Sequence, residues 1–365
     1  MFDWVPLPIY TAVYYHLMMF IVVLVGIHAA SFDLRDKQKL SGISGLAILL
    51  FIFILLYMGL RPISGRYFGD MASYARYFEN YQNGLPRIET GDWLFHTFMW
   101  LSAQVMSVKA FFLIVDLLYI LPMCLFSKKH FKHYWAFCFI LFLASFSFWT
   151  YGTNGLRNGL ATSFLIWGLV YYKDRKILMY LFFALGFFMH ASLIIPLAAF
   201  MVSYFLIKHP KYFFYIWLTA IPLSLAGGST WNTFFENLGF LEDRAQGYLV
   251  GGEEFEEYFS QTGFRWDFLL YSATGVFSGF YFIIKKKLKD TFYIHLFGIY
   301  AISNAFWILV ITAAFSNRFA YLSWFLLAPV IIYPLCKYQI EKNQYKVLGA
   351  IVFLYFLFTY VMFMK

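Results

Sequence analysis

Long apolar runs, separated by short polar or basic stretches, dominate the chain. Residues 8–30 form the first run and residues 43–60 the second, and Arg35, Lys37 and Lys39 lie between them. A helix needs about 20 apolar residues to cross a bilayer. Because cytoplasmic loops of membrane proteins are enriched in Lys and Arg, the basic stretch predicts a cytoplasmic loop and an external N-terminus.

The same rule predicts about twelve spans with both termini outside. They are residues 8–30, 43–60, 108–126, 134–151, 156–172, 177–190, 192–207, 212–226, 267–284, 291–315, 319–335 and 347–364. Two large polar stretches, 61–107 and 227–266, then become outer loops. The first contains a predicted helix, 70–81, and a shorter apolar segment, 92–106. We expect the latter to lie at the outer face, since crossing would place the lysines after residue 126 outside.

The composition excludes the other common classes of protein. Hydrophobic residues make up 62% of the 365 residues, charged residues 13%, and the mean hydropathy is +0.66. Soluble domains are about 45–50% apolar and about 25% charged. A soluble fold of this size could not hide so many apolar residues, and a disordered chain would contain far fewer. We therefore expect an all-α, polytopic membrane protein with one integral membrane domain, 1–365.

The surplus of positive charge, +9, divides by residue type in this layout. Sixteen of 18 lysines fall in predicted cytoplasmic loops, whereas eight of 10 arginines fall outside. These are Arg61, Arg66, Arg76, Arg87, Arg157, Arg244, Arg265 and Arg318. Arginine grips phosphate in a rigid, bidentate way, so the outer arginines predict an anionic ligand, with a lipid pyrophosphate as the natural candidate. Pairing with outer acids is the alternative, which we favour for Arg76, Arg87, Arg244 and Arg265.

Two segments of the first outer loop carry candidate chemistry. Asp70, Tyr74 and Tyr77 share one face of the helix 70–81, and a carboxylate beside phenolic hydroxyls can bind a sugar hydroxyl or take its proton. Asp92 and Trp93 open the segment 92–106, where the indole could stack on a sugar ring. Either aspartate could instead be only a helix cap. For His96, one turn further along, we favour a structural role.

Three further positions are polar residues at or near the predicted span ends. Arg157 lies between Gly155 and Gly159, which permit close approach of a helix or ligand, whereas snorkelling to the interface is the alternative. His190 lies in an apolar context, where a polar residue is a functional candidate, with an interhelical hydrogen bond as the alternative. Arg318 occupies another outer turn.

Within a span, Asp116 needs a partner, and we expect a structural bond to a neighbouring helix. No spacing indicates a metal site or a phosphate-binding glycine loop.

Four stretches, in order, resemble the EpsG-like, Wzy-type polysaccharide polymerases. They are Arg61 with Gly69-Asp70 and Tyr74, then Asp92-Trp93-Leu94-Phe95, then Arg157-Asn158-Gly159-Leu160-Ala161, and finally His190-Ala191-Ser192-Leu193. The predicted helix layout is similar over nearly the whole chain. Family members often have Glu where this chain has Asp92, and Gln where it has Asn158.

The resemblance implies a GT-C-like fold in the bacterial inner membrane, with the active site facing the periplasm. It implies transfer of a growing glycan from undecaprenyl pyrophosphate to a hydroxyl of a new lipid-linked repeat unit, without metal or cofactor. Partners would be lipid-linked glycans, the lipid bilayer and a chain-length regulator protein, but no nucleic acid. The product could be O-antigen, capsule or exopolysaccharide.

On this basis the residues receive expected roles. Arg157 and Arg318 would bind the pyrophosphate, Asp70 or His190 would be the base, and Tyr74 and Trp93 would hold sugars. Asp70, His190 and Arg157 are thus the expected catalytic residues, and the expected substrate-binding residues are Arg61, Arg66, Tyr74, Asp92, Trp93 and Arg318.

Two other function classes remain open. A lipid-linked oligosaccharide flippase or transporter should show inverted repeats around a midplane site, whereas no repeat is visible and the polar residues gather on one face. Another membrane glycosyltransferase or an O-antigen ligase fits the outer arginines almost as well. A single purified lipid-linked repeat unit separates these classes, because only a polymerase makes a ladder from it alone.

Overall fold

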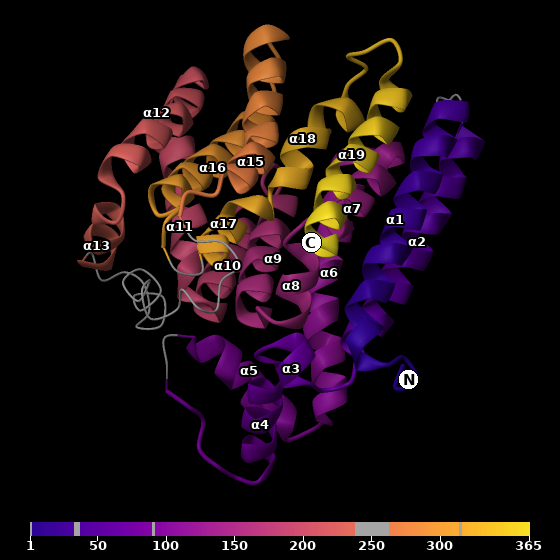
Figure 1. The fold of residues 1–365 in the computed structure, drawn as a ribbon, viewed down its shortest axis with the longest axis vertical. Coiled ribbons are helices and arrows are strands. Elements are labelled where there is room, and N and C mark those ends of the chain that lie inside the picture. Colours follow the sequence, from indigo (N-terminus) through magenta and orange to yellow (C-terminus); the bar gives the residue numbers. More distant parts are fainter. Residues whose placement is uncertain (1, 33–36, 90–91, 238–262, 314–315) are drawn as a thin grey trace. The chain divides into compact units, whose positions relative to one another are not determined.

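The computed structural model describes residues 2–32, 37–89, 92–237, 263–313 and 316–365, and every regular element in these ranges is a helix. The chain divides into two compact units (Figure 1). The first comprises Met1–His190 together with Ile332–Lys365, and the second comprises Ala191–Ile331. The predicted single domain, 1–365, stays a prediction.

A polytopic helical membrane protein is confirmed. Within the described ranges, seven helical segments are long and apolar enough to cross a membrane. They are Leu7–Ser31, Leu40–Gly59, Val108–Leu143, Trp266–Lys285, Thr291–Leu309, Ser316–Lys337 and Gln344–Met364. Several other predicted spans coincide with shorter helices, among them α9 (Leu156–Val170) and α10 (Lys176–Met189). The number twelve therefore stays a prediction.

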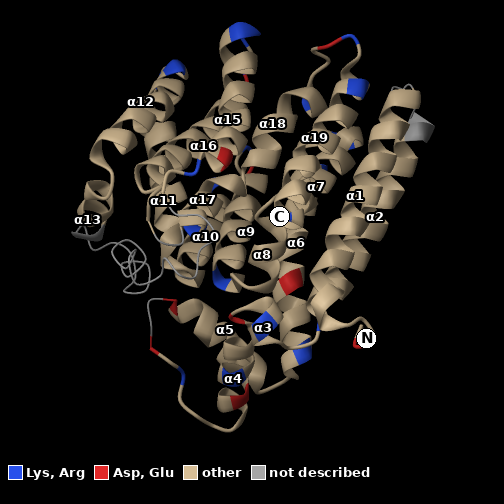
Figure 2. Cartoon of the chain, viewed as in Figure 1, with Lys and Arg blue, Asp and Glu red and all other residues tan. Residues whose placement is uncertain are grey.

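The first unit is built on four long helices. These are α1 (Leu7–Ser31), α2 (Lys37–Gly59), α6 (Val108–Phe131) and α19 (Gln344–Met364). α19 packs along α1, whereas α2 and α9 both pack along α6. In this unit the long helices carry almost no charge along their lengths, and charged residues gather at helix ends and around α3–α5 (Figure 2).

Local sequence explains two of the helix contacts in this unit. α6 ends because Lys132 has a positive φ of 45°, and α7 (Trp135–Leu143) turns back so that the rings of Phe126 and Phe142 meet edge to face. α9 and α10 approach closely at Gly168, where an added Cβ would lie 2.6 Å from the ring of Phe183. Small residues at such crossings are typical of membrane helices.

The first outer loop, 61–107, folds into short helices. α3 (Gly65–Phe68) and α4 (Met71–Gln82) follow one another, and α5 (Trp93–Ala103) comes before α6. The predicted helix 70–81 is thus confirmed within one residue at each end. α5 has only 11 residues, so it is too short to cross a bilayer alone.

The second unit has its own buried core. It contains α11 (Ile194–Met201), α12 (Lys211–Gly227), α13 (Thr230–Asn237), α15 (Trp266–Gly279), α16 (Thr291–Leu309) and α17 (Ser316–Trp324). The buried Asn304 accepts a hydrogen bond from Trp217 Nε1 (2.7 Å) and donates to Ser272 (3.1 Å) and Ser323 (2.9 Å), which ties four of these helices together. Most of the second predicted outer loop, 227–266, lies outside the described residues.

Candidate active site

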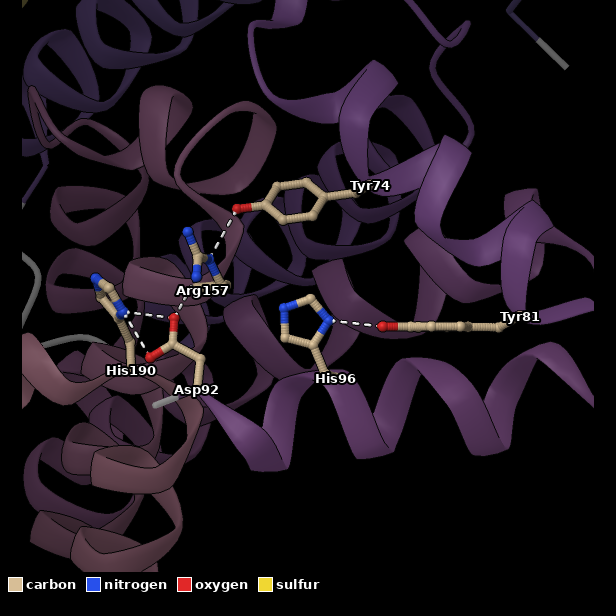
Figure 3. A network of polar contacts seen from close by, with 6 residues as sticks. All are labelled: Tyr74, Tyr81, Asp92, His96, Arg157 and His190. Atoms are coloured by element: carbon tan, nitrogen blue, oxygen red, sulfur yellow. Dashed lines mark hydrogen bonds and ion pairs between the residues drawn. The ribbon is translucent and has the colours of Figure 1, made fainter. Parts of the chain in front are cut away.

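Asp92 is the centre of a polar cluster in the first unit. It directly precedes α5, yet its side chain makes no capping hydrogen bond, so the helix-cap alternative is wrong for this residue. The carboxylate is 0% exposed and accepts hydrogen bonds from Arg157 Nη1 and from His190 Nδ1, the latter at 2.9 Å and 3.0 Å (Figure 3). A buried carboxylate is costly unless it is paired in this way.

Arg157 enters the cluster from the first turn of α9. Gly155 precedes the helix, and Gly159 packs so closely on Tyr151 that an added Cβ would lie 2.7 Å from the carbonyl oxygen of Tyr151. The Arg157 Nε–H also donates to the Tyr74 hydroxyl at 3.2 Å. With 17% of its side chain exposed, Arg157 keeps one edge at the surface of the cluster.

Tyr74 reaches the cluster from α4, as the sequence predicted for one face of that helix. Its hydroxyl lies against the Arg157 guanidinium, and its ring meets the ring of Phe95 edge to face. Burial raises the pKa of Tyr74, although the positive charge of Arg157 opposes this shift. Tyr74 is therefore a neutral phenol that fixes the position of Arg157.

His190 enters from the C-terminal end of α10. It takes an extended conformation (φ −160°, ψ 124°) directly after Met189 and is 15% exposed. An ionised carboxylate only accepts hydrogen bonds, so Nδ1 carries the proton toward Asp92. The second nitrogen, Nε2, points away from Asp92 (Figure 3) and is the lone-pair nitrogen whenever the ring is neutral.

A second histidine, His96, lies beside this cluster on α5. Its Nδ1 is 3.0 Å from the hydroxyl of Tyr81, and its side chain is almost completely buried. Burial lowers the pKa of His96 to about 4, assisted by the positive charges of Arg157 and Arg87 and opposed by Asp92. His96 is therefore neutral at physiological pH.

Two exposed aromatic rings border the cluster. Trp93 follows Asp92 directly and is 43% exposed, and its ring lies 5.3 Å from the ring of Phe188, two residues before His190. Arg87 Nη1 donates to the Trp93 carbonyl (3.3 Å) and to Thr97 Oγ1 (3.0 Å). This holds the first turn of α5 in place and leaves the Trp93 ring available to a ligand.

Asp70, a predicted catalytic residue, is half-buried before α4 and makes no side-chain capping hydrogen bond. Its backbone N–H donates to Asn154 Oδ1 at 2.9 Å, which connects it to the turn that precedes Arg157. The positioning role of Asn154, three residues before Arg157, was not predicted from the sequence. The role of Asp70 as base stays a prediction.

Arg61 makes an ion pair in the protein interior. Its Nη1 contacts Asp116 Oδ2 at 2.7 Å, its Nη2 donates to the Thr153 carbonyl at 3.2 Å, and both charged side chains are 0% exposed. The expected structural partner of Asp116 is thus confirmed. Such burial does not favour substrate contact by Arg61, which stays an untested prediction.

Four other predicted arginines lie on α3, in the second unit or outside the described residues. Arg66 is exposed on α3 and its guanidinium lies over the ring of Tyr67. Arg318 is half-buried on α17 of the second unit. Arg265 pairs with Asp267 at 2.8 Å, which agrees with the expected pairing of this arginine with an outer acid. Arg244 lies outside the described residues. Substrate binding by Arg66 and Arg318 stays a prediction.

Within the described parts of the chain, no group of three or more His, Cys, Asp or Glu residues could hold a metal ion. The expectation of a reaction without metal or cofactor is not tested by this observation.

Comparison with known protein families gives a match to the EpsG family over residues 46–365. This range includes every residue of the Asp92 cluster. Neither the curated proteins nor the solved structures contain a match to the chain.

Proposed function

The chain belongs to the EpsG family, and from this membership and the Asp92 cluster we propose that it polymerises lipid-linked glycan repeat units. The family supports a polysaccharide polymerase-like membrane protein with glycosyltransferase activity. The finer proposal is that repeat units on undecaprenyl pyrophosphate are joined on the outer face of the bacterial inner membrane. It also includes a GT-C-like arrangement of about twelve spans and a partner that regulates chain length.

The observation that carries the proposal is the double contact of a fully buried carboxylate. Asp92 contacts both Arg157 and His190, and each of these two has an exposed edge. One group is a permanent cation with a forked shape that suits phosphate, and the other is an imidazole, whose ring nitrogen can accept a proton. Glycosyl transfer from a pyrophosphate donor needs one of each.

His190 is the base in this proposal, in preference to Asp70. Asp92 holds Nδ1–H, which fixes the ring and leaves Nε2 to accept a proton, as in other carboxylate–histidine pairs. Once Nε2 is protonated, the imidazolium lies against the Asp92 carboxylate and is stabilised by it. Asp70 has no such arrangement among the described residues, since it bonds through its backbone, from its N–H to Asn154 Oδ1 and from its carbonyl to the Tyr74 N–H.

The reaction forms one carbon–oxygen bond and breaks another. The acceptor hydroxyl oxygen bonds to the anomeric carbon of the donor, and its proton passes to His190 Nε2. The bond between that carbon and the pyrophosphate oxygen breaks, and the lipid pyrophosphate leaves with the electron pair. Arg157 stabilises the charge that develops on this leaving group, while Trp93 stacks on a sugar ring of the substrate.

The test uses the purified protein, reconstituted in lipid, with one lipid-linked repeat unit. Wild type should produce a ladder of chains from that substrate alone. A ligase would need a second acceptor, and a flippase would form no bond, so either outcome would contradict the proposal. Positioned acid–base groups contribute about 10²–10⁴-fold in rate, so His190→Gln should slow the ladder by at least about 100-fold.

His16 offers a matched control. It also makes a hydrogen bond through Nδ1, to the Tyr360 hydroxyl at 2.8 Å, but it lies on α1 outside the region matched to the family. His16→Gln should leave the ladder unchanged. A His190→Gln protein that retains a third or more of the wild-type rate would exclude His190 as the base.

A further inference from the structure

His96 is a buried polar side chain that the mechanism above does not use. It lies one turn after Asp92 on α5, is 4% exposed, and its backbone N–H donates to the Asp92 carbonyl at 3.3 Å. Its ring also meets the ring of Tyr77 edge to face. The backbone bond explains how the helix begins, but it does not explain why an imidazole occupies this position.

The hydrogen bonds of Tyr81 determine which ring nitrogen of His96 carries the proton. The Tyr81 oxygen accepts the backbone N–H of Ile88 at 3.2 Å, and burial raises the pKa of Tyr81, so the phenol keeps its single proton. We therefore assign that O–H as the donor to His96 Nδ1, 3.0 Å away, which makes Nδ1 the acceptor. A neutral ring with an accepting Nδ1 carries its proton on Nε2.

The Nε2–H of His96 faces the candidate active site. Figure 3 shows this nitrogen on the side of the ring turned toward Arg157 and Asp92, opposite the Tyr81 contact. Within the described residues, Nε2 makes no hydrogen bond to the protein, and it is not wholly enclosed. A donor that is fixed in orientation and still accessible is suited to a ligand.

We propose that the His96 Nε2–H donates a hydrogen bond to a phosphate oxygen of the lipid pyrophosphate held by Arg157, an inference that rests on the proposed function. The positive charge of Arg157 acts more strongly on His96 than the negative charge of Asp92 does. We therefore favour an anionic phosphate oxygen over a neutral sugar hydroxyl as the acceptor. A neutral donor strengthens the grip on the leaving group without adding a second fixed cation. An added cation in the cluster would repel the proton that passes to His190 in the proposed reaction.

The experiment measures binding of inorganic pyrophosphate to the purified full-length protein by calorimetry, beside the rate of ladder formation. Loss of a hydrogen bond to a charged group should weaken pyrophosphate binding by about 10- to 100-fold in His96→Ala. His96→Gln should stay within about 3-fold of wild type, because its amide N–H reaches about as far as Nε2. His16→Ala is the control and should bind as wild type does.

Tyr81→Phe keeps His96 but removes the proton that fixes its tautomer. It should weaken pyrophosphate binding by a smaller factor, about 3-fold or more, and have no effect in a His96→Gln background. This coupling separates a donor role from simple loss of packing, which would weaken both backgrounds equally.

The possible failures are distinguishable. Equal pyrophosphate affinity in wild type and His96→Ala, or no measurable affinity in wild type, overturns the role of His96. So does a loss confined to the KM of the acceptor glycan, because it would place a sugar hydroxyl at Nε2. A wild type that binds pyrophosphate in a His96-dependent way but makes no ladder overturns only the proposed function.

Discussion

Replacement of Asp92 by Asn tests the centre of the candidate site with the smallest possible change. The amide has nearly the same shape as the carboxylate but lacks its charge, and its nitrogen can only donate. Arg157 then loses its buried counter-ion, and His190 Nδ1–H retains at most one acceptor oxygen. The ring can turn or change tautomer, which removes Nε2 as the base.

The size of the effect follows from these contacts. Asp92 accepts two hydrogen bonds from groups that are charged or become charged in the reaction, and such bonds contribute about 1.5–3 kcal/mol each. Loss of the bond to His190 alone corresponds to about 10–150-fold in rate, and the same change in a Ser-His-Asp triad costs about 10⁴-fold. We therefore expect ladder formation by Asp92→Asn to fall by about 10²–10⁴-fold, mainly through kcat.

The assay compares initial rates of ladder formation at saturating lipid-linked repeat unit, with thermal unfolding in the same detergent as the folding check. Asp70→Asn is the matched control, because Asp70 also precedes a helix of the first outer loop without capping it. It should retain most of the activity. A folded Asp92→Asn protein within about 5-fold of wild type, or a larger loss in Asp70→Asn, would refute the reasoning.

Four further outcomes are expected. Arg157→Lys should raise the KM for the lipid-linked donor by about 10-fold or more, measured from ladder rates, because an ammonium lacks the fork that contacts Asp92 and Tyr74 together. Trp93→Ala should raise the acceptor KM about 3- to 10-fold with kcat unchanged, whereas Trp93→Phe should not. Arg61→Met should destabilise the protein by about 3–5 kcal/mol in thermal unfolding, since it leaves the buried Asp116 unpaired. Because His96 has a pKa of about 4 when folded and about 6.5 when unfolded, its contribution to stability should be lost between pH 6.5 and pH 4; His96→Gln should therefore flatten the fall in melting temperature over that range.

Periodicity and charge predicted the helical membrane class and the helix 70–81, because those features follow from local sequence. The lengths of individual helices could not be predicted from local sequence. Residues 159–172 contain no charged residue, yet α9 ends at Val170 after 15 residues. The end of α6 depends on the left-handed conformation of Lys132, a residue type that rarely adopts a positive φ.

The members of the site were predictable, but their pairing was not. Arg157, His190 and Asp92 each stood out as a polar residue at the start or end of an apolar segment. Asp92 is 65 residues from Arg157 and 98 residues from His190 along the chain. Only the packing of α5, α9 and α10 brings the three side chains together. The local pattern favoured Asp70 equally as a base, because a helix cap and a buried carboxylate look the same in sequence.

The two Arg–Asp pairs of the first unit show what separates a structural ion pair from a candidate site. Arg61–Asp116 and Arg157–Asp92 share the same chemistry, and both aspartates are 0% exposed. Arg61 is also 0% exposed and uses its guanidinium on backbone carbonyls, so nothing from outside can compete for it. Arg157 keeps an exposed edge, and its aspartate is shared with a histidine that can change its charge. A pair with one accessible partner and one titratable neighbour can exchange protein contacts for substrate contacts at little cost. We propose Arg157 as the phosphate-binding residue for that property, and not for the count of outer arginines.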